Sequence, residues 1–370
     1  MSASKILYIF DAVDWNSRIP VAIEARKQGK DVIIGLIGDA DKIKDFQGLD
    51  IKKLSRPRFK PHSISPMKLV KEMRKLMKVE QPDILHVVPL KYGFLAGMAA
   101  HGLGDFKKIY TLAGLGYLFR SNTKSSAVMR GLIKPMLSYV LRKPCTHLIF
   151  QNSDDLKLMV DGNYARQEQC HLILGSGVHI DKFNPDPSTE EEPPIVLMPT
   201  RLVHEKGVSI FVEAARQLKA KGVNARFQIA GGETDNPKAI SKTEMLEMTK
   251  DGAVEWLGRV EDIPALLSRA ALVVYPSYYG EGLPRVLLEA CAAGKAIITT
   301  DHPGCREAVR HGENGLLVPV KDVSSTAQAI GELLSKPEIR HEMGQASRHR
   351  AEEEFDINII AVKTAALYRL

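Results

Sequence analysis

Short apolar runs rich in β-branched residues alternate along the chain with longer stretches of helical periodicity. This alternation is typical of βα units, in which helices cover the faces of a parallel sheet. In the first half of the chain we expect buried strands at 6–10, 32–37, 84–88 and 148–151. Between them, 18–28 and 67–79 have the pattern of amphipathic helices.

A second series of the same kind occupies the rest of the chain, with strands expected at 195–199, 227–230, 272–275, 296–299 and 316–318. The alternation pauses at 176–194, where prolines surround three consecutive acids, as in a surface linker. We therefore predict two α/β domains with parallel sheets, an N-terminal one at 1–175 and a C-terminal one at 195–351. The last helix, at about 352–370, can pack back on the N-terminal domain.

Composition places the chain among globular proteins with reduced cysteines. Its 370 residues are enough for two domains, and its four cysteines include no C-x-x-C pair. The apolar run at 87–104 is interrupted by Lys91 and His101, so we expect no transmembrane helix and only peripheral membrane contact. The formal net charge of +7 suggests an anionic partner without naming one.

The segment richest in candidate functional residues is 276–290, which follows an apolar strand and opens a helix. Gly280 and Gly282 would let backbone N–H groups approach a ligand, and a helix N-terminus favours an anion. Glu281 would lie at the mouth of the site, with Glu289 eight positions later on the helix. A capped helix with two surface acids explains the same residues equally well.

Three more loops at predicted strand ends favour the ligand-binding interpretation over the capped helix. Arg201 and Lys206 lie in the loop before the helix at 208–220, where they could converge on phosphate oxygens. Gly231–Gly232 and Gly258–Arg259 occupy the ends of two other strands. Four such loops in one half of the chain predict a pocket for a nucleotide or a nucleotide sugar.

Together these loops resemble the signature of the retaining GT-B glycosyltransferases of family 4, and the E-x7-E spacing of Glu281 and Glu289 is its most specific element. Further segments are similar to the bacterial subgroup that extends undecaprenyl-diphosphate-linked sugars: 114–119, 231–237, 262–263 and 301–307. The resemblance implies two Rossmann-like domains whose sheets face a central cleft. It also implies transfer of a hexose or N-acetylhexosamine, with GalNAc or Gal favoured, from a UDP-sugar to an undecaprenyl-diphosphate-linked saccharide.

The resemblance also assigns roles to single residues. It implies that Arg201 and Lys206 bind the donor diphosphate and that Glu281 contacts the transferred sugar, which makes these three the catalytic candidates. Glu289 would bind the ribose hydroxyls, and the loop at Gly258–Arg259 would hold the base. The expected donor-binding residues are Glu289, Gly282, Leu283, Arg259, Gly231 and Gly232.

The chain departs from the family pattern in its first half. The segment 11–18 replaces a Gly-Gly loop, and Ala113 stands where many members have a catalytic-looking histidine. A histidine acid/base is thereby excluded at that position, which favours same-face attack assisted by the leaving phosphate. Arg18 is our candidate for contacting a donor or lipid phosphate, the alternative being a solvated residue at a helix start.

Two other features have simpler explanations than catalysis. Asp39-Ala40-Asp41 matches the metal-binding D-x-D of another glycosyltransferase class, but its place after a strand favours helix capping. We expect no required metal and no cofactor. His86 lies in a predicted strand and is expected to be a hydrogen-bonded core histidine.

The excess positive charge lies in the first half of the chain. Residues 1–175 contain 28 Lys plus Arg against 16 Asp plus Glu, whereas 176–370 contain 23 against 28. Basic amphipathic helices are expected at 67–78 and 126–143, and both could contact an anionic membrane. Helices that pack on their own sheet with lysines outward are the alternative. The membrane interpretation places the protein in the cytoplasm, on the inner face of the cytoplasmic membrane.

Two competing functions remain open from the sequence. The first is a soluble family-4-type glycosyltransferase with a polar acceptor. The second is a nucleic-acid-binding protein, which positive charge alone suggests and which lacks interleaved aromatic and basic residues. We therefore expect no nucleic-acid partner.

Overall fold

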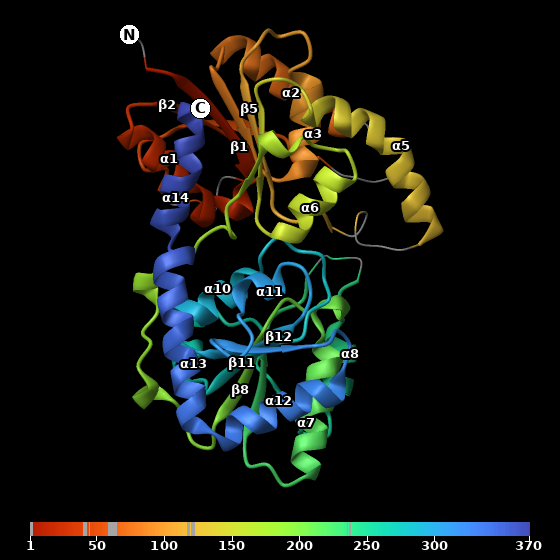
Figure 1. Cartoon of the computed structure of the whole chain (residues 1–370), viewed down its shortest axis with the longest axis vertical. Helices are drawn as coiled ribbons and strands as arrows, with labels where there is room; N and C mark the ends of the chain where they lie inside the picture. Colours follow the sequence, from red (N-terminus) through yellow and green to blue (C-terminus); the bar gives the residue numbers. More distant parts are fainter. Residues whose placement is uncertain are drawn as a thin grey trace. The chain divides into compact units, whose positions relative to one another are not determined.

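The computed structural model describes residues 3–39, 43, 45–57, 65–116, 119, 123–234, 236 and 238–370. The chain divides into two units (Figure 1): unit 1 comprises Met1–Ser176 with Ile357–Leu370, and unit 2 comprises Gly177–Asp356. Each unit is a parallel α/β domain, which confirms the predicted fold class. Among the described residues, no helix is both long and apolar enough to cross a membrane.

Unit 1 is built on a seven-stranded parallel sheet. Its strands are β1 (Lys5–Asp11), β2 (Asp31–Ile37), β3 (Asp50–Leu54), β4 (Ile84–Val87), β5 (Lys107–Leu112), β6 (Thr146–Phe150) and β7 (Cys170–Leu172). Their order is β3-β2-β1-β4-β5-β6-β7, so the chain reverses its direction of growth between β1 and β4. In sheets of this kind ligands bind beyond the carboxyl ends of the strands near that reversal.

Helices cover both faces of this sheet, because successive side chains of each central strand point to opposite sides. Leu7 and Ile9 of β1 belong to one core cluster, and Ile6, Tyr8 and Phe10 belong to the other. The first cluster is covered by α2 (Ser65–Glu80), α3 (Leu90–Ala99), α5 (Lys124–Leu141) and α6 (Ser153–Asp161). The second is covered by α1 (Trp15–Lys27) and the C-terminal α14 (Ile357–Ala366).

Helix α14 therefore belongs to unit 1, although it follows the whole of unit 2 in sequence. It packs against α1 and buries Ile360, Ala361 and Ala365 there. Figure 1 shows this blue segment beside the red helix α1. The C-terminal return expected from the sequence thus begins at Ile357.

Unit 2 has a six-stranded parallel sheet. Its strands are β8 (Ile195–Pro199), β9 (Arg226–Ala230), β10 (Glu255–Trp256), β11 (Leu272–Tyr275), β12 (Ala296–Thr300) and β13 (Gly315–Val318). The order β10-β9-β8-β11-β12-β13 repeats the topology of unit 1, with the reversal between β8 and β11. All five residues of β8 are buried, as expected of a strand covered on both faces.

The helices of unit 2 are α7 (Val208–Ala220), α8 (Lys242–Thr249), α9 (Ile263–Arg269), α10 (Arg285–Ala292), α11 (Cys305–Ala308), α12 (Val323–Ser335) and α13 (Pro337–Arg350). Helices α7 and α12 contact each other on one face of the sheet. Phe211 and Leu218 of α7 and Ile330 of α12 form its core with alternate residues of β8 and β9.

The segment predicted as a linker belongs to unit 2 from Gly177 onward, which corrects the expected boundary at 195. Ion pairs hold it to the domain. The buried Lys295 binds Glu190 at 3.2 Å, and Arg226 binds Glu191 at 2.7 Å. Two of the three acids that looked like a solvated linker surface, Glu190 and Glu191, therefore have cationic partners in the domain, and this was not evident from their local sequence.

Candidate functional site

The candidate site of unit 2 lies at the carboxyl edge of its sheet. The loops after β8, β9 and β11 begin at Thr200, Gly231 and Pro276, and parallel strands end at one edge. An open cavity of about 420 Å³ lies there. Its lining includes five of the predicted site residues: Arg201, Gly231, Gly232, Arg259 and Glu289.

Close packing between backbones shapes this cavity. At Gly231, a Cβ atom would lie 1.7 Å from the carbonyl oxygen of Thr200, so any larger residue would push the two loops apart. The N–H of Gly231 donates to the carbonyl of Gly258 at 2.7 Å, and the indole of Trp256 donates to the carbonyl of Gly231 at 2.8 Å. Main-chain contacts and the indole of Trp256 therefore hold together the loops that follow β8, β9 and β10.

Lys206 and Glu281, two predicted catalytic residues, bind each other directly. Lys206 is 2% exposed and forms an ion pair with Glu281. The hydroxyl of Tyr275 accepts a hydrogen bond from Lys206 at 2.6 Å and donates one to Glu281 at 2.9 Å. A buried charge is tolerated when it is paired and hydrogen-bonded, and this triad meets both conditions.

The electrostatics of Lys206 reflect this environment. Burial lowers the pKa of its ammonium group, and the adjacent Glu281 carboxylate opposes that shift. The positive charge of Arg201, which lines the cavity, also lowers the pKa of Lys206. By contrast, Lys206, Glu281, Gly282 and Leu283 are not part of the cavity lining.

Glu289 projects from α10 into the same cavity. Its carboxylate accepts a hydrogen bond from the Nε of Arg285 at 3.0 Å. Burial raises the pKa of Glu289, and the positive charge of Arg285 opposes the rise. A half-shielded carboxylate of this kind is a suitable acceptor for the hydroxyl groups of a ribose.

The loop that carries Glu281 rests on a neighbouring segment. Gly304 has a φ of +86°, and a Cβ atom there would lie 2.4 Å from the carbonyl oxygen of Gly282. The backbone of Glu281 and Gly282 is thus packed against the turn before α11. From the sequence, 301–307 is only one of the segments that carry the family resemblance, whereas in the structure it supports the Glu281 loop.

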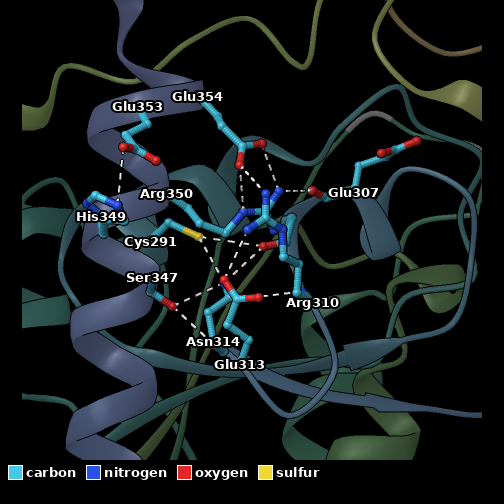
Figure 2. Close-up of polar contacts among 11 residues, drawn as sticks. Cys291, Glu307, Arg310, Glu313, Asn314, Ser347, His349, Arg350, Glu353 and Glu354 are labelled. Carbon is cyan, nitrogen blue, oxygen red and sulfur yellow. Dashed lines mark hydrogen bonds and ion pairs between the residues drawn. The ribbon is translucent and has the colours of Figure 1, made fainter.

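A buried polar network fixes the far end of that supporting segment (Figure 2). Arg350 of α13 donates to the backbone carbonyl of Glu307 at 3.1 Å and to Glu354 at 2.9 Å. The amide of Asn314 donates to the carbonyl of Ala308 at 3.1 Å and to Ser347 at 3.3 Å. These contacts join α11 and the turn before β13 to the helix behind them.

Arg18 of unit 1 is buried in the first turn of α1, at the carboxyl edge of the sheet. It is 8% exposed, and its Nε has no hydrogen-bond partner among the described residues. The side chains around it are neutral, including Tyr8, His86 and Thr111. The alternative of a solvated residue at the helix start is therefore wrong, because Arg18 is buried. Its guanidinium has no charged partner in the described part of unit 1.

His86 has the predicted core role. It is 1% exposed, and its two ring nitrogens lie 2.8 Å from the hydroxyls of Tyr368 and Thr111. Burial, assisted by the positive charge of Arg18, lowers the pKa of His86 to about 3. The ring is therefore neutral at physiological pH and adds no second positive charge beside Arg18.

Some sequence predictions fall outside the described residues, namely Ala40 and Asp41 of the D-x-D, Tyr117 and Leu118, and Asp235 and Pro237. Other contributors were missed by the sequence analysis. Tyr275 is the last residue of an apolar strand, and nothing in its neighbourhood suggests that its hydroxyl joins Lys206 to Glu281. Tyr279, whose ring centroid lies 4.8 Å from the Lys206 ammonium, is a second residue that the sequence did not single out.

Comparison with known proteins matches each half of the chain to a glycosyltransferase family model. The model for glycosyl transferases group 1 matches residues 180–350, and the model for glycosyl transferase 4-like proteins matches residues 5–152. The chain belongs to the GT-B glycosyltransferases. The family identified from the strand-end loops is thereby confirmed, and the protein is a transferase.

Curated relatives of this glycosyltransferase include bacterial enzymes that align along most of its length. The N,N'-diacetylbacillosaminyl-diphospho-undecaprenol alpha-1,3-N-acetylgalactosaminyltransferase of Campylobacter jejuni is 29% identical, covering 96% of this chain and 95% of that protein. The capsular polysaccharide biosynthesis glycosyltransferase CapM of Staphylococcus aureus is 26% identical over 82% of this chain and 81% of that protein.

Solved structures share the fold of this glycosyltransferase. The sucrose-phosphate synthase of Thermosynechococcus elongatus has a TM-score of 0.80 at 20% identity, covering 99% of this chain and 98% of that one. HepE of Anabaena, solved in complex with UDP and glucose, has a TM-score of 0.75 at 18% identity, covering 99% of this chain and all of that one. These similarities establish the GT-B architecture.

Proposed function

We propose that this glycosyltransferase moves a hexose or N-acetylhexosamine, with GalNAc or Gal favoured, from a UDP-sugar to an undecaprenyl-diphosphate-linked saccharide in bacterial glycan assembly. The observation that carries the donor half of the proposal is the convergence of Arg201, Arg259 and Glu289 on one cavity. The acceptor half is supported by the end-to-end similarity to the Campylobacter jejuni enzyme, whose name specifies such an acceptor.

In the proposed donor complex, Arg201 and Lys206 bind the diphosphate. Glu289 accepts hydrogen bonds from the ribose hydroxyls, and the loop at Gly258–Arg259 holds the base. The glycines Gly231 and Gly232 permit close approach of the nucleotide, because no side chain of theirs occupies the cavity. The backbone of Gly282 and Leu283 would hold the phosphate or the sugar.

The proposed chemistry uses the charges at this edge of the sheet. Departure of UDP builds negative charge on its β-phosphate, and preorganised cations lower the energy of that transition state. Lys206 is preorganised by Tyr275, which fixes its ammonium group at 2.6 Å. Glu281 would balance positive charge that develops at the anomeric carbon. Because these cations stabilise the leaving group, we propose a reaction that requires no metal.

We propose retention of anomeric configuration by attack on the face from which UDP leaves. Ala113 stands where a histidine acid/base would be needed, so the acceptor hydroxyl would transfer its proton to the departing phosphate. Lys206 and Arg201 would then stabilise the leaving diphosphate as it separates. Nuclear magnetic resonance of the product's anomeric proton reports the configuration directly.

We further propose that Arg18 binds a phosphate of the acceptor. A buried guanidinium without a carboxylate is costly, and a phosphate satisfies both its charge and its paired donors. The acceptor's lipid chain would make the protein peripheral at the inner face of the cytoplasmic membrane.

A panel of donors crossed with acceptors tests this function. UDP-GalNAc, UDP-Gal, UDP-GlcNAc and UDP-Glc are each incubated with short prenyl-diphosphate-linked sugars and with free sugars, in buffer with and without EDTA. The expected result is a product of one added sugar on the diphosphate-linked acceptors only, in equal yield with EDTA. Transfer to the free sugars alone would identify a soluble enzyme with a polar acceptor, and loss of activity in EDTA would refute metal independence.

A further inference from the structure

Helix α5 carries an apolar face that the described residues of unit 1 leave uncovered. Five large side chains on it are each at least half exposed: Val128, Met129, Leu132, Met136 and Tyr139. Their spacing of three and four residues places them along one stripe of the helix. Leu137, Val140 and Leu141, on another side, are buried in the core of unit 1, so the helix is anchored while its apolar stripe remains in solvent.

Helix α2 differs, although the sequence predicts a membrane contact for both helices. Leu69, Met73 and Met77 of α2 are buried in the core. The guanidinium of Arg74, on the same helix, donates hydrogen bonds to the carbonyls of Ala99 and His101 at 2.8 and 2.6 Å and so contributes to folding. The alternative interpretation therefore holds for α2, which packs on its own sheet with its lysines outward.

The charge around α5 indicates which surface it would meet. Residues 106–153 contain eight Lys or Arg and no Asp or Glu. Lys124 lies at the start of α5, and Arg142 and Lys143 follow its end. The ammonium of Lys143 lies 4.4 Å from the ring centroid of Tyr139, so a cation borders the apolar stripe directly.

We propose that the stripe formed by Val128, Met129, Leu132, Met136 and Tyr139 of α5 inserts into the interface of an anionic lipid bilayer. An exposed apolar face with flanking cations is the arrangement by which helices lie in the plane of an anionic membrane. The stripe supplies the apolar contact, and the cations supply attraction to the headgroups. The choice of a bilayer over a protein partner rests on the proposed lipid-linked acceptor.

Flotation with lipid vesicles tests the assignment in the full-length protein. The test variant is Leu132→Glu/Met136→Glu, and the matched control is Val79→Glu on α2, because Val79 and Leu132 are both 68% exposed. Vesicles containing phosphatidylglycerol are compared with vesicles of phosphatidylcholine alone. We expect wild-type protein and the control to float with the anionic vesicles, and the bound fraction of the α5 variant to fall at least tenfold.

The proposal is overturned if the α5 variant floats as well as wild-type protein. It is also overturned if light scattering shows that α5 covers a second copy, with a wild-type dimer that Leu132→Glu/Met136→Glu converts to a monomer and no vesicle binding by either. Thermal unfolding shows whether the variant is folded; because both side chains are exposed, we expect an unchanged midpoint. If the variant is unfolded, Leu132→Ser/Met136→Ser replaces it, with the same expected loss and the same contradicting result.

A second readout separates this inference from the proposed function. Transfer to a short, water-soluble prenyl-diphosphate acceptor needs no bilayer, so we expect the α5 variant to retain wild-type turnover with it. Vesicle binding without transfer to any such acceptor would refute the proposed function and leave the α5 assignment intact. Transfer to such an acceptor without binding to anionic vesicles would refute the α5 assignment and leave the proposed function intact.

Discussion

At the scale of single residues, the unusual feature of this glycosyltransferase is that its buried charges differ in how they are satisfied. Lys206 has a carboxylate and a hydroxyl as partners, whereas Arg18 has no charged partner among the described residues. A paired charge holds a site in shape, while an unpaired one costs stability until an anion arrives. Removing the two charges should therefore change the free energy of unfolding in opposite directions.

Replacement of Arg18 by methionine is expected to stabilise the protein and weaken acceptor binding. Removing a buried guanidinium whose Nε has no hydrogen-bond partner among the described residues should raise the free energy of unfolding by about 1–3 kcal/mol. The KM for a prenyl-diphosphate acceptor should rise tenfold or more, with the Kd for UDP unchanged. Urea denaturation and steady-state kinetics measure both effects.

Arg26→Met provides the control on the same helix. Arg26 is exposed and donates to the carbonyls of Gln47 and Gly48, both at 3.3 Å, so its loss should slightly lower stability and leave the acceptor KM unchanged. An Arg18→Met protein that is less stable than wild type and binds acceptor normally would show that Arg18 is a structural residue.

Glu289 should make nucleotide binding depend on pH. Its raised pKa means that the carboxylate becomes protonated at a higher pH than an ordinary glutamate does. Because the proposed contact needs the ionised form, UDP affinity should weaken as the pH falls through that raised value. Calorimetric titration of UDP across the acidic range measures this, and Glu289→Gln should bind more weakly with no such inflection.

The same shift has a defined effect on stability. A carboxyl group whose pKa is raised on folding binds its proton more readily in the folded state. Its contribution to the free energy of unfolding is therefore complete below the unfolded pKa and is lost as the pH rises through the folded pKa. A pH-independent difference in stability between wild type and Glu289→Gln would contradict this assignment.

At the scale of elements, most of the central strands and the edge strand β13 were predictable, whereas the central strand β5 and the edge strands β3, β7 and β10 were missed. The runs 195–199 and 272–275 match β8 and β11 residue for residue, because strands buried on both faces read as continuous apolar sequence. The edge strands β3 and β10 were missed, since Asp50–Leu54 contains two lysines and Glu255–Trp256 is only two residues long.

The candidate site was also predictable only in part. The positions of glycines and charges after strands predicted which loops converge, because topology alone decides that. The pairing of Lys206 with Glu281 depends on how two loops pack side by side, and the isolation of Arg18 depends on which neighbours are neutral. Neither property is encoded in local spacing.

The support of the Glu281 loop by the turn before α11 can be tested with two glycines. Gly304 and Gly312 have similar left-handed φ values of +86° and +82°, but only a Cβ at Gly304 meets backbone, the carbonyl of Gly282 at 2.4 Å; around Gly312 there is nothing within 4 Å. Gly304→Ala should therefore lose about 1–3 kcal/mol more stability than Gly312→Ala.

Gly304→Ala should also raise the KM for the UDP-sugar, because the displaced carbonyl belongs to the proposed donor loop. Gly312→Ala carries the same backbone strain without that displacement, and its donor KM should stay at the wild-type value. Equal losses of stability and equal donor KM values in the two variants would show that the contact between the turn and the loop does not position the donor site.

At the scale of the whole molecule, two units of the same topology carry different charges. Unit 2 presents a cavity with Arg201 and Arg259 within a mildly acidic half of the chain, whereas unit 1 carries the excess of Lys and Arg and the exposed stripe of α5. This division is consistent with a soluble nucleotide sugar bound by one unit and a lipid-linked acceptor met by the other. Unit 1 depends on helix α14 and on the turn that follows it, where the hydroxyl of Tyr368 lies 2.8 Å from a ring nitrogen of His86.

The central claim is that Lys206 and Glu281 act together in sugar transfer, and steady-state turnover of their variants tests it most directly. With a UDP-sugar and a prenyl-diphosphate acceptor, Lys206→Met, Glu281→Gln and the double variant should each lose about 10²- to 10³-fold in kcat, and the losses should not add, because the residues act as a pair. The exposed Lys221→Met should retain full turnover. Folded Lys206→Met or Glu281→Gln protein with a wild-type kcat would contradict the claim.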